Sequence, residues 1–123
     1  MIRVFIADDH PLLRRGLNMM LSDTEDIVVS GEASNGEEVL EKLEDNNCDV
    51  LVLDIVMPRK TGIEVLREIR AQGNNIPVLM LSTFAGEEFE KEALEAGAAG
   101  YITKAEAPEK LLEAIRKVHS ERR

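Results

Sequence analysis

The sequence predicts an open three-layer α/β sandwich, in which helices cover both faces of a parallel sheet. Two observations lead to this fold class. About five short apolar runs alternate with segments of helical periodicity, and such alternation produces a parallel sheet with right-handed crossovers. Two of the runs, Val50–Leu53 and Val78–Leu81, are apolar at every position, as in strands buried on both faces. So few strands cannot close an eight-stranded barrel, so we expect a flavodoxin-like sandwich with five strands in the order 2-1-3-4-5.

The strands are expected at four clear apolar runs and at one weaker segment. In chain order the clear runs are Ile2–Ala7, Val50–Leu53, Val78–Leu81 and Tyr101–Ile102. The weaker segment, Ile27–Val29, is followed by polar and glycine residues. Because an edge strand has a neighbour on one side only, this composition favours an edge position for the second strand.

Helices are expected between the strands, where apolar residues recur three or four positions apart. The apolar stripes are Leu13, Leu17, Met20 and Leu21; Val39, Leu40 and Leu43; Val65, Leu66 and Ile69; Phe89, Ala93 and Ala96; and Leu111, Leu112, Ile115 and Val118. We interpret all of these stripes as core packing. Ser34–Glu37 fits a capping box before the second helix, Gly97 suits the position after the fourth, and Pro108 suits the first turn of the fifth.

The composition restricts the class of protein. At 123 residues the chain has the size of one domain, which we place at residues 1–119, with residues 120–123 as the start of a linker or an artificial end. A net charge of -9 argues against nucleic acid as a direct partner, because phosphate binding needs a basic surface. One cysteine and two histidines exclude an internal disulfide, a thiolate zinc cluster and a histidine-rich metal site.

The chain also lacks the sequence signals of membrane insertion and export. No apolar run approaches the ~20 residues of a membrane span. The apolar N-terminus, Met1–Ala7, is too short for a signal peptide and carries a charge at Arg3. We therefore expect a cytoplasmic protein with no membrane partner.

Polar residues follow four of the predicted strands. Asp8–Asp9 follow the first strand and Asp54 follows the third. Ser82–Thr83 follow the fourth strand, and Lys104 comes shortly after the fifth. Because ligands of open α/β sheets bind outside the carboxyl ends of the strands, we expect these groups to converge at one edge of the sheet.

Three carboxylates in one cleft repel each other, and a hard divalent cation relieves that repulsion. Mg²⁺ takes oxygen ligands and is commonly held by one or two carboxylates together with phosphate oxygens. A carboxylate beside Mg²⁺ and a lysine is also a suitable nucleophile toward a phosphoryl group, because metal, ammonium and hydroxyl groups stabilise the charge of the transition state. The residues therefore predict phosphoryl transfer onto Asp54, with Mg²⁺ as the cofactor.

Helix capping is the competing explanation for the paired aspartates. Aspartate is a favoured N-cap residue and Pro11 suits the first helical position, so Asp8 or Asp9 could cap the first helix. Asp54 has no such explanation, because the segment Ile55–Pro58 that comes after it is not the start of a helix. Phosphoryl transfer therefore explains more of the pattern than capping does.

Four segments together resemble the receiver domain of bacterial two-component response regulators. They are Asp8–Asp9, Asp54–Gly62, Val78–Ser82 and Gly97–Lys104. The opening Ala7–Leu17 is similar to the NarL/FixJ (LuxR-type) branch, whose members carry a C-terminal helix-turn-helix DNA-binding domain after a linker. The resemblance implies a phosphorylation-activated switch that takes its phosphoryl group from a sensor histidine kinase. It does not imply an enzyme with a separate substrate.

The resemblance also implies roles for the acidic residues and the lysine. Asp54 matches the phosphoacceptor, and Asp9 and Asp54 match the direct Mg²⁺ ligands. Asp8 is implied to act on the metal mainly through water, and the main-chain carbonyl of Val56 to be a further ligand. Lys104 matches the lysine that pairs with the phosphoryl group.

Two further residues match the switch that responds to phosphorylation. The interval to the conserved lysine assigns the switch hydroxyl to Ser82 rather than Thr83, and Tyr101 matches the aromatic that changes rotamer. Phosphorylation is implied to favour a homodimer and to regulate an effector. That effector is expected to be transcription, through a DNA-binding domain beyond residue 123.

The sequence departs from the family pattern beside the predicted site. Thr61 precedes Gly62, where many relatives have aspartate. Arg59 and Lys60 place two positive charges near the acidic pocket, where they could steer an anionic partner or offset the cluster. His10 is expected at the start of the first helix rather than as a metal ligand, because Mg²⁺ prefers oxygen.

Two positions that flank the phosphoryl group in receivers predict a long-lived phosphorylated state. They are Val56 and Phe84, and neither side chain can orient a water molecule for hydrolysis. A water-positioning group typically contributes about 10²–10⁴-fold to such a reaction. We therefore expect slow autodephosphorylation.

Three other functions are alternatives. A haloacid-dehalogenase-type phosphatase also uses a strand-end aspartate and Mg²⁺, but Val56 occupies the position of its general acid. A flavodoxin-like FMN protein needs a Ser-, Thr- and Gly-rich phosphate loop, whereas Asp8–His10 would repel phosphate. A stand-alone receiver that acts by protein contact differs from a DNA-binding regulator only in the chain beyond residue 123.

Overall fold

The computed structural model describes residues 1–83 and 86–121, and its architecture is the predicted sandwich. Five parallel strands form one sheet in the order β2-β1-β3-β4-β5. The strands are β1 (Ile2–Ala7), β2 (Ile27–Ala33), β3 (Val50–Asp54), β4 (Val78–Ser82) and β5 (Gly100–Thr103). The helices are α1 (Pro11–Ser22), α2 (Gly36–Asp45), α3 (Gly62–Ala71), α4 (Glu87–Glu95) and α5 (Ala107–Ser120). The predicted fold class and strand order are confirmed.

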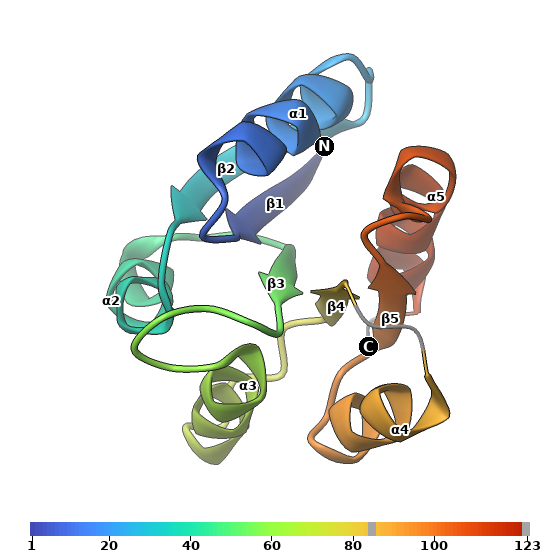
Figure 1. Cartoon of the computed structure of the whole chain (residues 1–123). Coiled ribbons are helices and arrows are strands. Elements are labelled where there is room, and N and C mark those ends of the chain that lie inside the picture. The colour runs from blue at the N-terminus through green and yellow to red at the C-terminus, as the bar shows by residue number, and fades with distance from the viewer. Residues whose placement is uncertain (84–85, 122–123) are drawn as a thin grey trace.

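Helices α1 and α5 lie on one face of the sheet, and α2, α3 and α4 lie on the other (Figure 1). Each face has its own apolar core, because successive side chains of a strand point to opposite faces. Phe5 and Leu53 pack on the side of α2–α4, whereas Ile6 and Val52 pack on the side of α1 and α5. None of the helices in the described part of the chain is long and apolar enough to cross a membrane.

Strand β2 occupies an edge of the sheet, as predicted, but extends past the apolar segment to Ala33. An extra residue, Ser30, interrupts its register with β1 between Val4 and Phe5. Asn46 holds this bulge, because its Nδ2 donates to the Ser30 carbonyl at 2.8 Å and its Oδ1 accepts from the Ser30 hydroxyl at 3.0 Å. The polar residues after the apolar run therefore belong to the strand, supported by the end of α2.

The capping boxes lie elsewhere than the sequence predicted. The Oδ1 atom of Asn35 accepts the Glu38 N–H at 2.9 Å, so the capping box predicted at Ser34–Glu37 is wrong by one position. Asparagine is at least as good an N-cap as serine, and here the chain folds into the helix one residue later. A complete capping box instead opens α3, where Thr61 and Glu64 exchange hydrogen bonds.

Helix α4 departs from the predicted core packing at its first apolar position. Phe89 is 42% exposed, so its assignment to the core is wrong, whereas Ala93 is fully buried. Ala96 packs at the edge of the core, and Gly97 comes next with φ of 108°, as predicted for the residue after a helix. The first turn is rich in glutamates that favour contact with water. Helix α4 is therefore anchored to the sheet through its C-terminal half.

Candidate functional site

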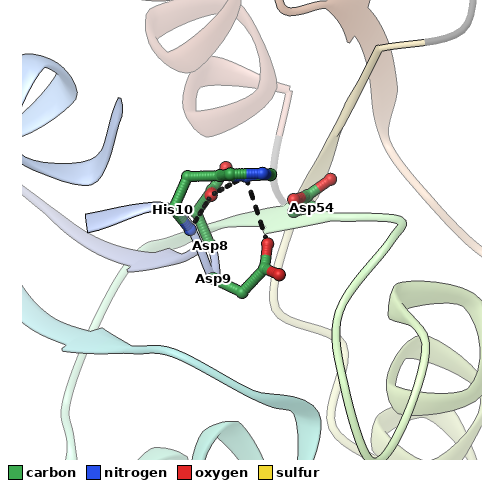
Figure 2. Close-up of side chains that lie close together, drawn as sticks. All are labelled: Asp8, Asp9, His10 and Asp54. Atoms are coloured by element: carbon green, nitrogen blue, oxygen red, sulfur yellow. Dashed lines mark hydrogen bonds and ion pairs between the residues drawn. The ribbon is translucent and has the colours of Figure 1, made fainter. Parts of the chain in front are cut away.

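The carboxyl ends of β1 and β3 bring four ionisable side chains together. Asp8, Asp9 and His10 come from the turn after β1, and Asp54 is the last residue of β3 (Figure 2). One ligand atom from each residue lies within 4.8 Å of the others. Asp8 and Asp54 are buried, at 0% and 1% exposed, whereas the His10 side chain is 63% exposed. The expected convergence of the three aspartates is therefore present.

Lys104, from the turn after β5, lies against the buried aspartates. Its Nζ atom is 3.0 Å from Oδ2 of Asp54 and 3.2 Å from Oδ2 of Asp8. Its main-chain N–H donates to the carbonyl of Ser82 at 2.7 Å, which ties this turn to the end of β4. The parallel register thus brings the predicted lysine to the predicted phosphoacceptor.

Asp8 is held by the turn that it begins. Its Oδ1 accepts the main-chain N–H of His10 at 2.8 Å, and its carbonyl accepts from Nη1 of Arg14 at 2.6 Å. His10 occupies the N-cap position of α1, and Pro11 is the first helical residue. The alternative that Asp8 or Asp9 caps α1 is therefore wrong, because the helix begins after both of them.

Burial and like charge shift the ionisation of this cluster. Burial raises the pKa of Asp54 to about 6; the hydrogen bond from Lys104 opposes that shift, and the negative charge of Asp8 adds to it. Burial lowers the pKa of Lys104, but its hydrogen bond to Asp54 and the charges of both aspartates outweigh burial and leave that pKa raised. One ammonium group therefore compensates only part of the negative charge, and the cluster favours a further cation.

The donor atoms at this site suit a hard divalent cation. Among the described residues, Oδ2 of Asp8 and Oδ1 of Asp9 are buried and accept no hydrogen bond, although Nζ of Lys104 lies 3.2 Å from the former and Nδ1 of His10 lies 3.2 Å from the latter. Buried carboxylate oxygens of this kind are costly unless a cation or a proton compensates them. Carboxylate oxygens are also the ligands that Mg²⁺ takes, usually together with water. Asp8, Asp9 and Asp54 could therefore hold Mg²⁺.

Ser82 and Tyr101 lie on the face of the sheet that α2–α4 cover. Met80 packs in that core, and Ser82, two residues further along β4, points to the same face. Tyr101 pairs with Met80 in the sheet and packs against the same core. Ser82 is buried and Tyr101 is half-buried. The two predicted switch residues therefore share the side of the sheet that carries α4.

Of the two residues predicted to flank the phosphoryl group, the structure describes Val56. Its side chain is 51% exposed, and its N–H donates to Oδ1 of Asp54 at 3.3 Å. Its carbonyl stays a predicted metal ligand. Phe84 lies outside the described residues.

The two cations of the β3–α3 loop pair with glutamates of neighbouring helices. Arg59 Nη1 lies 3.3 Å from Oε2 of Glu37 on α2, and Lys60 Nζ lies 2.7 Å from Oε1 of Glu68 on α3. These contacts attach the loop to both helices. The predicted use of the two charges to offset the acidic cluster therefore has no support in these contacts.

Gly62 allows the start of α3 to approach the end of β3. Its N–H donates to the carbonyl of Ile55 at 2.7 Å. A Cβ atom at this position would collide with the main-chain oxygen of Asp54. The glycine therefore sets the path of the chain directly behind the candidate phosphoacceptor.

Glu106 supports the Lys104 turn and was not among the sequence-based expectations. Its Oε1 accepts the N–H and the hydroxyl of Thr103 at 3.1 and 3.0 Å, and Oγ1 of Thr103 accepts the Glu106 N–H at 3.2 Å. The hydrogen bond from Lys110, at 2.7 Å, and those from Thr103 lower the pKa of Glu106 to about 2. The spacing of Thr103 and Glu106 is that of a capping box, so the sequence contained this signal.

Comparison with known proteins settles the family. A family profile described as the response regulator receiver domain matches residues 4–116. The chain is a response regulator receiver domain. Receiver domains are signalling modules of two-component systems, and they generally bind Mg²⁺ at an acidic pocket. In this receiver domain the acidic pocket is the cluster of Asp8, Asp9 and Asp54.

The curated relatives of this receiver domain are longer proteins. The chain is 40% identical over 115 residues to the uncharacterized transcriptional regulatory protein YxjL of Bacillus subtilis, covering 94% of the chain and 53% of YxjL. It is 37% identical over 123 residues to the response regulator UvrY of Escherichia coli, covering 100% of the chain and 56% of UvrY. The chain thus spans about half the length of the curated relatives it matches.

Solved structures of receiver domains superpose closely on this one. A LuxR-family response regulator from an Aurantimonas species matches with a TM-score of 0.92 and 32% identity, covering 98% of this chain and 86% of that chain. The receiver domain of the putative response regulator NarL from Mycobacterium tuberculosis also matches with a TM-score of 0.92 and 32% identity, covering 98% of both chains. The receiver domain therefore belongs to the NarL/FixJ branch, as predicted.

Proposed function

We propose that this receiver domain takes a phosphoryl group from a phosphohistidine of a sensor histidine kinase onto Asp54. The observation that carries the proposal is the placement of this carboxylate. It is buried, it lies 3.0 Å from Nζ of Lys104, and it joins Asp8 and Asp9 in one cluster. Buried ionisable groups with shifted pKa values and specific charge partners are typical of reactive sites.

The transfer uses the residues of this cluster in distinct roles. A carboxylate oxygen of Asp54 attacks phosphorus in line, the P–N bond breaks, and the donor imidazole leaves with the bonding electrons and takes up a proton. With a pKa of about 6, Asp54 is mostly ionised at pH 7 and therefore nucleophilic. The ammonium of Lys104 stabilises the charge on the equatorial oxygens.

Mg²⁺ is the proposed cofactor. Asp9 and Asp54 would bind it directly, Asp8 through water and Val56 through its carbonyl. The bound ion would neutralise charge on the phosphoryl oxygens. Support for this assignment comes from the buried carboxylate oxygens of Asp8 and Asp9, which accept no hydrogen bond among the described residues.

Phosphorylation is proposed to act on Ser82 and Tyr101. The aspartyl phosphate adds negative charge and acceptor oxygens at the end of β3. Ser82 and Lys104 are drawn toward it, and Tyr101 turns into the space that Ser82 leaves. The phosphoryl group thereby shifts the population between two existing conformations. The half-buried ring of Tyr101, packed on the side of α4, supports this step.

We further propose that the whole protein is a transcriptional regulator that forms a homodimer when phosphorylated. The relative YxjL is named a transcriptional regulatory protein, and the matched relatives are about twice as long as the region they share with this chain. The chain beyond Ser120, the last residue of α5, would then begin the linker to a helix-turn-helix domain that binds DNA. Phosphatase activity on other substrates is disfavoured, because Val56 cannot act as a general acid.

The test compares phosphorylation of the parent with that of Asp54→Asn. Both proteins are incubated with acetyl phosphate and Mg²⁺, and intact mass is measured. Asp45→Asn, on the exposed end of α2, is the matched control for loss of one aspartate. We expect one phosphoryl addition in the parent and in Asp45→Asn, and none in Asp54→Asn. Equal labelling of Asp54→Asn, with unchanged circular dichroism, would remove Asp54 from its proposed role.

A further inference from the structure

We propose that His10 supplies a nitrogen ligand to the cation site, so that this domain binds Ni²⁺ and similar transition cations more tightly than an all-oxygen site would. The inference rests on the divalent-cation site of the proposed function. It adds His10 to the ligands of that site and adds transition-metal cations to the ions that the site binds.

The positions of the donor atoms support this inference. Nδ1 of His10 lies 3.2 Å from Oδ1 of Asp8 and 3.2 Å from Oδ1 of Asp9 (Figure 2). Two ligands at right angles on a cation with bonds of about 2.1 Å lie about 3.0 Å apart. The His10 nitrogen and the Asp9 oxygen are therefore already at about the separation that adjacent ligands of one ion require.

The whole cluster can close around an ion with small movements. The four donor atoms of Asp8, Asp9, His10 and Asp54 lie within 4.8 Å of one another. Opposite ligands of an octahedral ion with bonds of about 2.1 Å are about 4.2 Å apart. Figure 2 shows the ring of His10 and the carboxylate of Asp9 extending toward Asp54, so a modest contraction would suffice.

The backbone directs His10 to this cluster rather than to the helix that it begins. His10 is the N-cap residue of α1, yet its side chain makes no capping hydrogen bond among the described residues. Its main-chain N–H is held by Asp8, and Pro11 comes next as the first helical residue. With its backbone fixed on both sides, His10 presents its ring to the carboxylates of Asp8 and Asp9.

The lysine and the proposed cation use different sides of Asp8. Nζ of Lys104 contacts Oδ2 of Asp8 and Oδ2 of Asp54, whereas Nδ1 of His10 lies near Oδ1 of Asp8 and Oδ1 of Asp9. Nζ of Lys104 also lies 3.4 Å from Nδ1 of His10, a long hydrogen bond that a cation bound to this nitrogen would replace. The ammonium can therefore keep its aspartate partners while a cation binds beside His10.

The imidazole of His10 is expected to raise the affinity of the site for some metal ions and not for others. Mg²⁺ prefers oxygen and binds imidazole poorly, so His10 adds little to its affinity. Ni²⁺, Co²⁺ and Zn²⁺ bind imidazole well, and affinity at mixed nitrogen and oxygen sites rises from Mn²⁺ toward Cu²⁺. His10 therefore acts on the discrimination between metal ions rather than on Mg²⁺ binding itself.

The competing explanation is that His10 only hydrogen-bonds to the carboxylates. It is separated from the proposal by titrating untagged protein with MgCl₂ and with NiCl₂ in a calorimeter, for the parent and for His10→Ala. His119→Ala removes the second histidine of the chain, on α5, and controls for adventitious Ni²⁺ binding. Pulsed EPR of the Mn²⁺-loaded proteins reports directly whether a ¹⁴N nucleus is bound to the metal.

The proposal expects His10→Ala to weaken Ni²⁺ binding by about tenfold or more while changing Mg²⁺ affinity by less than about twofold. The ¹⁴N coupling should be present in the parent and in His119→Ala, and absent from His10→Ala. Unchanged Ni²⁺ affinity and no histidine coupling in the parent would overturn the role of His10 and leave the Mg²⁺ site standing. Failure of the parent to bind Mg²⁺ at all would overturn the cation site and this inference together.

Discussion

Lys104 donates to Asp54 across 50 residues of sequence, with Nζ 3.0 Å from Oδ2. The same ammonium lies 3.2 Å from Asp8, so one cation serves two buried carboxylates. Burial keeps the pKa of Asp54 raised despite its lysine partner, and the shortage of positive charge leaves the repulsion from Asp8 uncompensated. The same shortage of positive charge makes the pocket responsive to metal binding, to protonation and to phosphorylation, since each of these changes the local charge.

Removing one acidic charge should stabilise the metal-free domain. We expect Asp9→Asn to raise the free energy of unfolding by about 1 kcal/mol in buffer containing EDTA, because it relieves repulsion among three carboxylates. The same change should weaken Mg²⁺ binding and reduce the stabilisation that Mg²⁺ gives. Calorimetric unfolding with and without Mg²⁺ measures both effects, with Asp45→Asn as the control. A lower apo stability for Asp9→Asn would contradict the charge-repulsion account.

The raised pKa of Asp54 predicts a pH dependence of stability in the absence of metal. A carboxyl whose pKa is higher in the folded state stabilises the fold when protonated, and this contribution is lost as pH rises through the folded pKa. This contribution is lost over the pH range from the ordinary aspartate pKa of 3.8 to the folded pKa of about 6. Urea unfolding should show the parent losing stability relative to Asp54→Asn across this window. Parallel curves for the two proteins would show that the carboxyl is not strained by burial.

Glu106 should titrate near pH 2, in the opposite sense to Asp54. Its folded pKa is about 2 against an ordinary value of 4.5, so its contribution to stability is present above 4.5 and is lost as pH falls toward 2. Carboxyl NMR titration measures this value directly. The Lys110→Met variant removes the largest cause of the shift and should raise the pKa of Glu106. A Glu106 pKa near 4.5 in the parent would mean that the Thr103 and Lys110 contacts do not persist in solution.

Two glycines should respond in opposite directions to alanine. At Gly62 a Cβ would collide with the main-chain oxygen of Asp54, so Gly62→Ala should cost about 2–3 kcal/mol and disturb phosphorylation. At Gly16, inside α1, a Cβ would meet no atom of the described residues within 4 Å other than its chain neighbours and the backbone of its own helix. Gly16→Ala should therefore stabilise the domain by about 0.5–1 kcal/mol. Urea unfolding of both variants tests the pair, and a similar loss for each would refute the steric argument.

The phosphorylated state should decay slowly in excess Mg²⁺. The valine side chain at position 56 is exposed beside Asp54 and cannot orient a water molecule. We expect replacement of Val56 with Asn and Phe84 with Glu to speed hydrolysis by about tenfold or more, because a positioned polar group assists water attack. Decay is followed by intact mass after removal of acetyl phosphate. No acceleration in the double variant would show that water placement does not limit the lifetime.

Much of the scaffold and the site could be predicted because their signals are local. The apolar runs of β3 and β4 identify buried parallel strands, and alternation with helices leaves few topologies. Once the strands are known, a parallel sheet places all of their carboxyl ends at one edge. Asp8, Asp9, Asp54 and Lys104 therefore had to lie near one another, whatever the details of the loops.

Other features could not be predicted from the sequence, because they depend on how the elements pack in three dimensions. Asn35 and the preceding serine are both suitable caps, and in the folded chain Asn35 is the one that caps α2. Phe89 fits an apolar stripe by spacing, yet α4 sits so that Ala93 is buried and the phenyl ring is exposed. The pKa of Asp54 depends on burial, on the charge of Asp8, which the pairing of β1 with β3 brings beside it, and on Nζ of Lys104 at 3.0 Å. Sequence pattern specifies which residues meet at the sheet edge, and packing specifies how closely they meet and in which charge state.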